Sequence, residues 1–334
     1  MTIACFGETL LRLAAPGREL LLQSGRLNAH IGGAEANVAI GLACLGHKTR
    51  MISWLPDNPL GRAALGELRR HGVDVSGVAM GDGRMGLYFL AAGAGPRPSS
   101  IVYDRDGSSF GRTGAEDYDW QALLEGADHL HLSGITPALG EGPAEAALTA
   151  AEAASRAGIG VSFDGNYRAQ LWERRVADPR PILGELVGRA TVFFGNHRDI
   201  SLLLGRSFSG GSREEQREAA DAAFAAFPNL KLIASTARIV EDADCHRIDA
   251  RIDAPGEWVE TEEVRVTGIV DRIGTGDAFV AGVLHGLRIG SALQDSARIG
   301  LALSRLKHTL PGDASLFGRD DLDAMLAGTS DVRR

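Results

Sequence analysis

Short apolar runs alternate along the chain with longer stretches in which apolar residues recur every three or four positions. The short runs predict buried β-strands at Ile3–Phe6, Arg50–Trp54, His129–Leu132, Gly160–Phe163, Ala190–Phe194 and Lys231–Ser235. The longer stretches predict helices at Ala34–Leu45, Leu60–His71, Pro143–Ala157, Pro181–Gly188, Arg213–Ala225, Thr275–Arg288 and Ala292–Leu306. This alternation favours an α/β fold, with a mostly parallel sheet covered on both faces. Ligands of such sheets bind beyond the carboxyl ends of the strands.

Two segments interrupt the alternation. Residues 10–31 hold three strand-like pieces, LLRLA, RELLL and LNAHI, and residues 86–103 read as a hairpin. We predict a small second sheet, built from about residues 9–31 and 84–106, that projects from the core. Its exposed edge and face need cover, which a lid over a site or a contact between two chains would supply. An ordinary peripheral hairpin is the alternative.

Composition narrows the class of protein. The 334 residues, 44% of them apolar, suffice for one large domain or two. We expect one domain over residues 1–325 and a tail over 326–334. The net charge of −8 argues against nucleic acid as a partner, and no run reaches the roughly 18 apolar residues of a membrane helix. Three scattered cysteines and the lack of a signal peptide favour the cytoplasm.

The segment VDRIGTGDAFVAGVLHGL, residues 270–287, places Gly274, Thr275 and Gly276 directly before Asp277 and a predicted helix. The first turn of a helix has unpaired N–H groups and a partial positive charge, and glycines let an anion approach the backbone closely. The segment could therefore hold a transferring phosphoryl group, with Asp277 placed to accept the proton of an attacking hydroxyl. A glycine turn with an aspartate cap is the plainer interpretation.

Neither familiar phosphate-binding motif explains this segment. A dinucleotide fingerprint needs a third small residue after an early strand, whereas Phe279 stands at that position and the segment lies near the C-terminus. A P-loop needs glycine followed by lysine, and none of the three lysines follows a glycine.

Two segments resemble the signatures of a known family. DRIGTGDAFVAG (271–282) resembles the C-terminal signature of the ribokinase, or phosphofructokinase-B type, sugar kinases, and GGAEANVAIGLACLG (32–46) resembles their N-terminal signature. The resemblance spans residues 2–325. It implies a ribokinase-like three-layer α/β/α core with a small β lid. It also implies a kinase that uses ATP and Mg²⁺ to phosphorylate a small molecule.

Four further segments resemble the 2-keto-3-deoxygluconate kinase branch of that family: GETLLRL (7–13), YFLAAGAGPRPSSIVYDR (88–105), FDGNYRAQLW (163–172) and LKHTLPGD (306–313). This resemblance implies phosphorylation of the terminal hydroxyl of 2-keto-3-deoxy-D-gluconate to the 6-phosphate. Guanidinium groups bind planar carboxylates well, which makes Arg105 and Arg168 candidates for the acid group of that sugar.

The resemblance assigns roles to individual residues. Asp277 matches the catalytic base, and Gly274, Thr275 and Gly276 match the anion hole. The positions that match sugar contacts are Gly33, Asn37, Tyr88, Tyr103, Arg105, Asn166, Arg168 and Asp313. Those that match nucleotide contacts are Asn196, Ser235, Thr236, Arg238, Gly274 and Gly276. Asp199 matches a residue that helps to place magnesium.

The chain departs from the family pattern at several positions. Asp199 stands where the family has glutamate, so its reach is shorter. Gly165 replaces the proline of the branch motif, and Thr275 replaces the commoner alanine, so its hydroxyl either bonds a phosphate or caps the helix. Residues 233–247 lack the glycine-rich pattern of many relatives, which leaves the adenine contacts unassigned.

Other functions stay open at this point. A related kinase could act on 2-keto-3-deoxygalactonate, fructose, ribose or a nucleoside, because one inverted hydroxyl changes few contacts. A sugar-acid sensor without catalysis is a more distant alternative, which loss of Asp277 or of the glycines would have indicated. A scaffold that dimerises through the lid is a third. In any of these cases a lid with one apolar face predicts a homodimer, since symmetric pairing covers both lids at once.

Overall fold

The apolar runs form the centre of a ten-stranded sheet within the part of the chain that the computed structural model describes, residues 1–175 and 178–328. Its strand order is β13-β12-β11-β10-β9-β8-β1-β4-β5, with β14 paired to β12. The pairing is parallel from β5 to β11 and antiparallel from β11 onward. The strands are β1 (Thr2–Phe6), β4 (Thr49–Pro56), β5 (Asp74–Gly81), β8 (Ala127–Ser133), β9 (Gly160–Asp164), β10 (Val192–Phe194), β11 (Leu232–Asp242), β12 (Cys245–Ala254), β13 (Glu257–Glu260) and β14 (Val264–Thr267).

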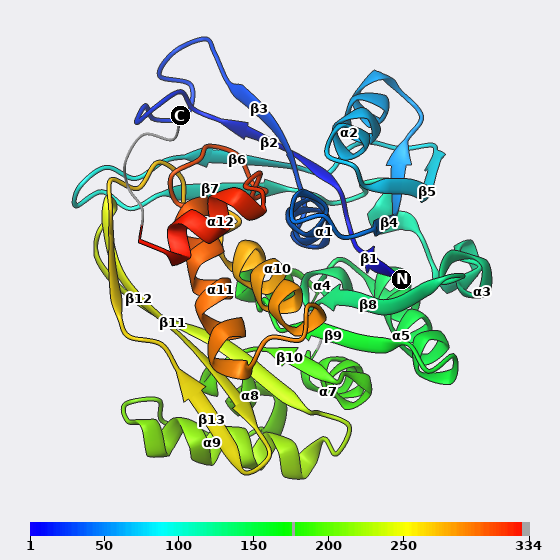
Figure 1. Ribbon diagram of the computed structural model, residues 1–334. Coiled ribbons are helices and arrows are strands. Elements are labelled where there is room, and N and C mark those ends of the chain that lie inside the picture. Colours follow the sequence, from blue (N-terminus) through cyan, green and yellow to red (C-terminus); the bar gives the residue numbers. More distant parts are fainter. Residues whose placement is uncertain (176–177, 329–334) are drawn as a thin grey trace.

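Helices cover both faces of this sheet (Figure 1). One buried apolar cluster contains residues of α1 (Ala34–Cys44), α10 (Thr275–Arg288) and α11 (Leu293–Lys307), and the other contains residues of α5 (Glu141–Arg156) and α7 (Arg180–Arg189). The remaining helices are α2 (Pro59–Arg70), α3 (Trp120–Leu123), α4 (Ile135–Ala138), α6 (Ala169–Arg175), α8 (His197–Leu204), α9 (Arg213–Ala226) and α12 (Arg319–Leu326). No helix of the described residues is both long and apolar enough to cross a bilayer.

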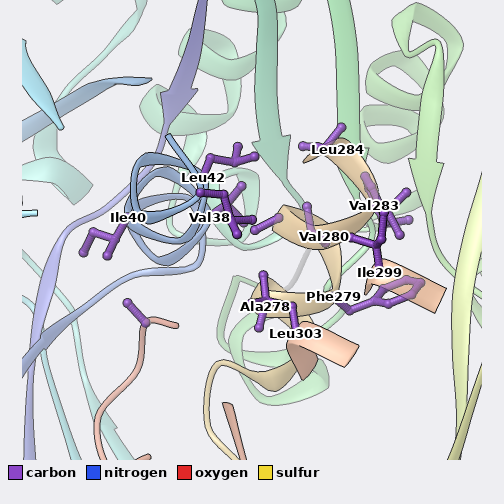
Figure 2. Close-up of a cluster of buried hydrophobic side chains, with 14 of the residues drawn as sticks. Val38, Ile40, Leu42, Ala278, Phe279, Val280, Val283, Leu284, Ile299 and Leu303 are labelled. Carbon is purple, nitrogen blue, oxygen red and sulfur yellow. The ribbon is translucent and has the colours of Figure 1, made fainter. Parts of the chain in front are cut away.

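Helices α10 and α11 pack closely because glycines face each other between them. A Cβ atom on Gly282 would lie 2.7 Å from the Cα of Gly300, so neither position tolerates a larger residue without a shift. Figure 2 shows Val38 of α1, Val280 of α10 and Ile299 of α11 in one buried apolar cluster between these helices. The packing fixes the direction in which the first turn of α10 points.

A separate four-stranded sheet, called the lid here, has the order β3-β2-β6-β7. Its strands are β2 (Leu10–Ala14), β3 (Asn28–Gly32), β6 (Leu87–Ala91) and β7 (Ser100–Asp104), and they lie along the upper edge of Figure 1. The predicted strand-like piece RELLL was wrong, because residues 18–22 form turns with Leu20 and Leu22 exposed. Pro16 and Gly17 precede this piece, and no neighbouring strand pairs with it.

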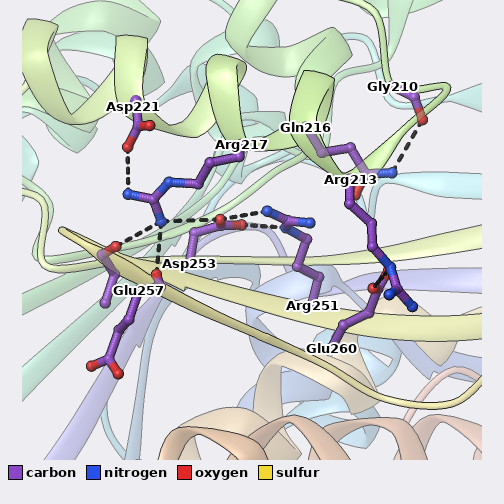
Figure 3. Close-up of polar contacts among 10 residues, drawn as sticks. Gly210, Arg213, Gln216, Arg217, Asp221, Arg251, Asp253, Glu257 and Glu260 are labelled. Carbon is purple, nitrogen blue, oxygen red and sulfur yellow. Dashed lines mark hydrogen bonds and ion pairs between the residues drawn. The ribbon is translucent and has the colours of Figure 1, made fainter.

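Hydrogen bonds and ion pairs of a cluster of charged residues link α9 to the antiparallel edge of the main sheet (Figure 3). The buried guanidinium of Arg251 donates two hydrogen bonds to Asp253, at 2.7 and 2.9 Å. Arg217 of α9 donates to the backbone carbonyl groups of Ala254 and Glu257 at 2.9 and 2.7 Å. Because the partners come from α9, β12 and β13, the cluster holds the turn between these two strands against the helix.

The predicted fold class, a ribokinase-like α/β core with a small β lid, is confirmed. The prediction omitted β5 and the antiparallel strands β12, β13 and β14, and in these last three strands charged residues interrupt or flank the apolar positions. The predicted helices also lacked α3, α4, α6, α8 and α12. The predicted tail starts at the last residue of α12, and residues 329–334 lie outside the described part of the chain.

Candidate active site

A cavity of about 960 Å³ lies beyond the carboxyl ends of β9, β10 and β11, with the lid over one side. Every site residue predicted from the sequence lines it: Gly33, Asn37, Tyr88, Tyr103, Arg105, Asn166, Arg168, Asn196, Asp199, Ser235, Thr236, Arg238, Gly274, Thr275, Gly276, Asp277 and Asp313. Segments more than 200 residues apart in the sequence therefore meet at one place, as expected for the switch region of a parallel sheet.

The first turn of α10 faces this cavity. Gly274, the residue before the helix, has a left-handed backbone (φ 75°), and a Cβ there would lie 1.6 Å from the backbone oxygen of Asp313. Only glycine fits this position. The hydroxyl of Thr275 donates to the backbone oxygen of Arg272 at 3.0 Å, so it closes the turn rather than facing a ligand. The N–H groups of residues 274–277, called the anion hole here, are left at the cavity wall.

Asp277 does not cap the helix, because its carboxylate bonds elsewhere. The side-chain nitrogen of Asn37 donates to Asp277 Oδ2 at 2.6 Å and orients the carboxylate. Burial raises the pKa of Asp277 to about 7, while the Asn37 hydrogen bond and the charge of Arg168 oppose the rise. A carboxylate with a pKa near neutrality suits general-base catalysis. The other amide atom, Asn37 Oδ1, is buried without a hydrogen-bond partner among the described residues, which leaves it for a ligand hydroxyl.

Two further carboxylates lie near Asp277. Asp164 ends β9, and burial together with the charge of Asp277 raises its pKa to about 8. Burial also raises the pKa of Asp199. The Asp199 carboxylate accepts the backbone N–H of Asn196 at 2.8 Å, and the Asn196 side chain accepts that of Arg198, so both residues cap α8. The sequence analysis missed Asp164, although a carboxylate directly after a buried strand could have indicated it.

The turn after Asp164 is held by the same carboxylate. Asp164 Oδ1 accepts the N–H of Asn166 at 3.1 Å, and Asn166 has a left-handed backbone with φ 37°. Asparagine tolerates this region better than most residues. The turn directs Asn166 and Arg168 to the cavity wall. Gly165 stands where the family has proline, and a Cβ atom there would lie 3.3 Å from the Asp199 carboxyl carbon.

At the lid end of the cavity, the predicted sugar contacts are already paired with one another or with neighbours. Buried Arg105 forms an ion pair with buried Glu8, Nη2 to Oε2 at 2.6 Å. The Tyr88 hydroxyl donates to Asp313 Oδ2 at 2.5 Å, and Arg12 Nη1 lies 3.0 Å from Asp313 Oδ1. Tyr103 stands opposite Tyr88 across the β6–β7 pair. Sequence reasoning missed Glu8 and Arg12, which the GETLLRL motif contains.

At the other end, called the nucleotide end here, three arginines gather. Arg168, Arg238 and Arg272 line the cavity, and no carboxylate pairs with them among the described residues. Burial lowers the pKa of Arg238, and the charges of Arg272 and Arg168 lower it further. Ser235, Thr236 and Arg238 also border a smaller cavity of about 200 Å³ on the α8 and α9 side of β11. Such an arrangement attracts a ligand with several negative charges.

The comparisons with known proteins cover nearly the whole chain. A 2-dehydro-3-deoxygalactonokinase of Haloferax volcanii is 33% identical over 332 residues, which cover 98% of this chain and 96% of that protein. A 2-dehydro-3-deoxygluconokinase of Bacillus subtilis is 28% identical over 342 residues, with the same coverage. The crystal structure of a 2-dehydro-3-deoxygluconokinase of Thermotoga maritima superposes with a TM-score of 0.93 at 35% identity, covering 98% of this chain and 100% of that one. Residues 2–316 match the model of the pfkB family of carbohydrate kinases, and the chain belongs to that family.

Proposed function

We propose that this kinase transfers the γ-phosphoryl group of ATP to the terminal hydroxyl of 2-keto-3-deoxy-D-gluconate and gives the 6-phosphate. The observation that carries the proposal is the position of Asp277 beside the anion hole in the cavity wall, where the side-chain nitrogen of Asn37 donates to its carboxylate at 2.6 Å. The names of the relatives support the substrate class. 2-Dehydro-3-deoxygluconate is another name for 2-keto-3-deoxygluconate, and 2-dehydro-3-deoxygalactonate, which the name of the Haloferax volcanii relative contains, is its epimer.

In this mechanism Asp277 takes the proton of the sugar hydroxyl while the hydroxyl oxygen attacks the γ-phosphorus in line. An oxygen–phosphorus bond forms, the bond to the β-phosphate oxygen breaks, and ADP leaves. The anion hole at the start of α10 stabilises the charge that spreads over the phosphoryl oxygens. Positioning supplies most of the rate enhancement, because the protein forms no covalent bond to the substrate.

Asp164 and Asp199 would hold magnesium, either directly or through water. Burial raises the pKa of both carboxyl groups, and the charge of Asp277 raises that of Asp164 further, so a bound cation would favour their ionised forms. Magnesium suits one or two carboxylates combined with water and phosphate oxygens, which fits the finding that no larger group of His, Cys, Asp or Glu gathers in the described chain. When bound, the ion supplies charge neutralisation at the β- and γ-phosphates.

The acid group of the sugar needs a cation, which Arg105 at the lid end and Arg168 near Asp277 would supply. Arg105 Nε and Nη2 bond Glu8, so we expect Arg105 to contact the acid through Nη1. Arg168 is exposed, and its guanidinium donates a long hydrogen bond, at 3.3 Å, to the backbone oxygen of its neighbour Tyr167. We expect the Arg168 guanidinium to move onto the acid group when the sugar binds. Gly33, Asn37, Asn166 and Tyr103 would meet the sugar hydroxyls.

The test is an ADP-release assay with MgATP and a substrate panel of ketodeoxygluconate, ketodeoxygalactonate, gluconate, fructose, ribose and adenosine. Turnover on ketodeoxygluconate with little on the neutral sugars supports the proposal. A higher kcat/KM on ketodeoxygalactonate than on ketodeoxygluconate would make that epimer the proposed substrate and leave the phosphoryl transfer from ATP unchanged. Turnover on a neutral sugar alone discards the roles of Arg105 and Arg168 while keeping Asp277.

We also propose a homodimer that forms through the lid, and a cytoplasmic location. Val102 of the lid strand β7 is exposed at 52%, and Leu20 and Leu22, in the segment between β2 and β3, are exposed at 56% and 79%, so apolar side chains are available for such a contact. Sedimentation velocity of the wild type and of Val102→Asp tests the dimer, which the variant should dissociate. The location rests on the three cysteines, all of which are free.

A further inference from the structure

One arginine of the lid is completely buried and reaches into the core. Arg12 lies on β2, is 1% exposed, and stands beside Tyr88 in the register of β2 and β6. Its Nη2 donates to Asp271 Oδ2 at 2.6 Å, and its Nη1 lies 3.0 Å from Asp313 Oδ1. Both carboxylates belong to the core, so a single guanidinium joins the lid to it at two points.

Asp271 in turn fixes the backbone that leads into the anion hole. Its Oδ1 accepts the N–H of Ile273 at 3.0 Å, and its Oδ2 accepts the N–H of Gly312 at 3.1 Å. Gly274 follows at once and lies against the backbone oxygen of Asp313, the contact that excludes a Cβ. The orientation of the first N–H groups of α10 therefore depends on where Asp271 holds this loop.

The charges around the loop balance only when Arg12 is present. Lys307 is buried beside the same two carboxylates, and its Nζ donates to the backbone oxygen of Leu310 at 2.9 Å. Two cations and two carboxylates thus form a neutral cluster behind the anion hole. Removal of Arg12 would leave a net negative charge there, which opposes the charge of phosphoryl oxygens on the other side of the loop.

We propose that Arg12 is a positioning residue for phosphoryl transfer: through Asp271 and Asp313 it fixes the anion hole while the lid covers the cavity. Arg12 lies behind the cavity wall rather than in it, so it acts through these two residues and not on the substrate. A lid that moves away would take Arg12 with it and disturb the anion hole, so that phosphoryl transfer depends on lid position. The inference rests on the proposed kinase function and names how its site is assembled.

The kinetic test uses Arg12→Lys, Arg12→Gln and Asp271→Asn, with Arg84→Lys as the matched control. Arg84 lies before β6 and forms an ion pair with Asp104 of the lid strand β7 at 2.6 Å, but this pair is partly exposed, and the hydrogen bonds of Arg84 go to Asp104 and Asp106 rather than to Asp271 or Asp313. We expect kcat to fall by about 100-fold in the Arg12 variants, because misplacement by about 1 Å has that effect, with both KM values within about threefold. The double variant Arg12→Gln, Asp271→Asn should lose no more than the worse single variant, since both changes break one contact.

A folded Arg12 variant with kcat within about threefold of wild type would overturn the inference, and so would a loss confined to the KM of the sugar acid. Melting curves show whether each variant folds. If neither Arg12 variant folds, Asp271→Asn decides the question. Asparagine keeps an acceptor for the Ile273 N–H, so this variant should fold, and a kcat equal to that of the wild type would overturn the inference.

Hydrogen–deuterium exchange provides a readout that needs no turnover. Amides of residues 273–277 should exchange roughly tenfold faster in Arg12→Gln than in the wild type, and at the wild-type rate in Arg84→Lys. Equal exchange in all three proteins would overturn the inference. Absence of turnover in the wild type on every sugar acid would instead contradict the proposed function, while the exchange result still decides the role of Arg12.

Discussion

The two ends of the cavity use charge in opposite ways. At the lid end, Arg105 is paired with Glu8, and Asp313 is held between Tyr88 and Arg12. At the nucleotide end, Arg168, Arg238 and Arg272 form no ion pair within the described residues, and burial together with the charges of Arg272 and Arg168 lowers the pKa of Arg238. The charged groups of the lid end are paired before any ligand arrives, whereas the three arginines of the nucleotide end have no ion-pair partner among the described residues.

This difference matches the ligands that the two ends are proposed to bind. A sugar acid has one negative charge and many hydroxyl groups, so its pocket needs a fixed shape and few free charges. Buried pairs give such a shape, because breaking one leaves an uncompensated charge in the interior. A nucleoside triphosphate brings about four negative charges, and arginines without partners bind it without first giving up an ion pair.

The largest effect is expected at Asp277, where the two ends meet. Asp277→Asn removes the proton acceptor but keeps the Asn37 contact through the amide oxygen. We expect kcat to fall about 1,000-fold, within the range for loss of a general base. The coupled assay measures kcat, and calorimetry should give a sugar-acid Kd within about threefold of wild type. A variant with nearly full turnover would exclude Asp277 as the base.

The next prediction separates the two ends by stability. Arg105→Met leaves Glu8 buried and unpaired, so we expect the free energy of unfolding to fall by about 3–5 kcal/mol. Arg238→Met relieves repulsion, so its stability should equal or exceed that of the wild type, while the KM for ATP rises by about tenfold. Urea denaturation and initial rates measure these quantities. Equal losses of stability in the two variants would contradict the contrast.

A control for that prediction removes both partners at the lid end. Glu8→Gln combined with Arg105→Met no longer buries an unpaired charge, so the double variant should regain part of the lost stability. Ser108, which also donates to Glu8, can donate to the glutamine oxygen in the double variant. No recovery would mean that Arg105 stabilises the fold through its packing rather than through the ion pair.

The pH dependence of activity and of stability should have opposite signs. Burial raises the pKa of Asp277 to about 7, so kcat/KM should rise with pH up to about 7 and then level off, as the base loses its proton. Below that pH the folded chain keeps a proton that the unfolded chain releases near its ordinary value, so stability falls as pH rises from about 4 to about 7. Burial also raises the pKa of Asp164, to about 8, so its ionisation continues the loss of stability as the pH rises to about 8.

Thermal melting at several pH values without magnesium tests the sign. Asp277→Asn should melt at the wild-type temperature near pH 4 and above it near pH 8, because the variant lacks the group whose ionisation destabilises the fold. Identical melting curves at both pH values would contradict a raised pKa at this position.

The centre of the molecule could be predicted from its sequence, since buried parallel strands are continuous apolar runs and their helices have a clear period. The cavity-lining residues followed because two motifs at opposite ends of the chain matched one family. What the motifs could not show is which of these residues already have partners. Arg105 and Arg168 look equivalent in sequence, but the first is held by Glu8 and the second is free to meet a ligand.

The antiparallel edge shows the other limit. From Ile248 to Ala254 every second residue of β12 is apolar, yet Arg251 and Asp253 occupy the alternate positions and are buried as well. A charged residue usually indicates an exposed face, so a strand with both faces covered was not expected there. The pairing with Arg217 of α9 that makes this burial possible joins residues 36 positions apart, and no local pattern encodes it.

The smallest effect is expected where the two ends touch each other. The β6–β7 turn of the lid meets the β11–β12 turn of the nucleotide end: Ala243 N–H donates to Gly95 O at 2.9 Å, and Asp244 accepts the Gly95 N–H at 3.1 Å and pairs with Arg18. Asp244→Asn weakens this contact. The pair is exposed, so we expect less than about 1 kcal/mol of stability to be lost, with a KM for the sugar acid raised by about twofold at low salt and unchanged near 0.5 M salt.

Asp178→Asn is the matched control, because Asp178 forms an equally exposed pair with Arg180 away from the lid. A second measurement compares the Kd of the sugar acid with and without a non-hydrolysed ATP analogue. If the turn contact links the two ends, the analogue should tighten sugar-acid binding in the wild type and in Asp178→Asn, but less in Asp244→Asn. The same tightening in all three proteins would show that the two ends communicate through the anion hole and Arg12 alone, and that the turn contact only closes the edge of the cavity.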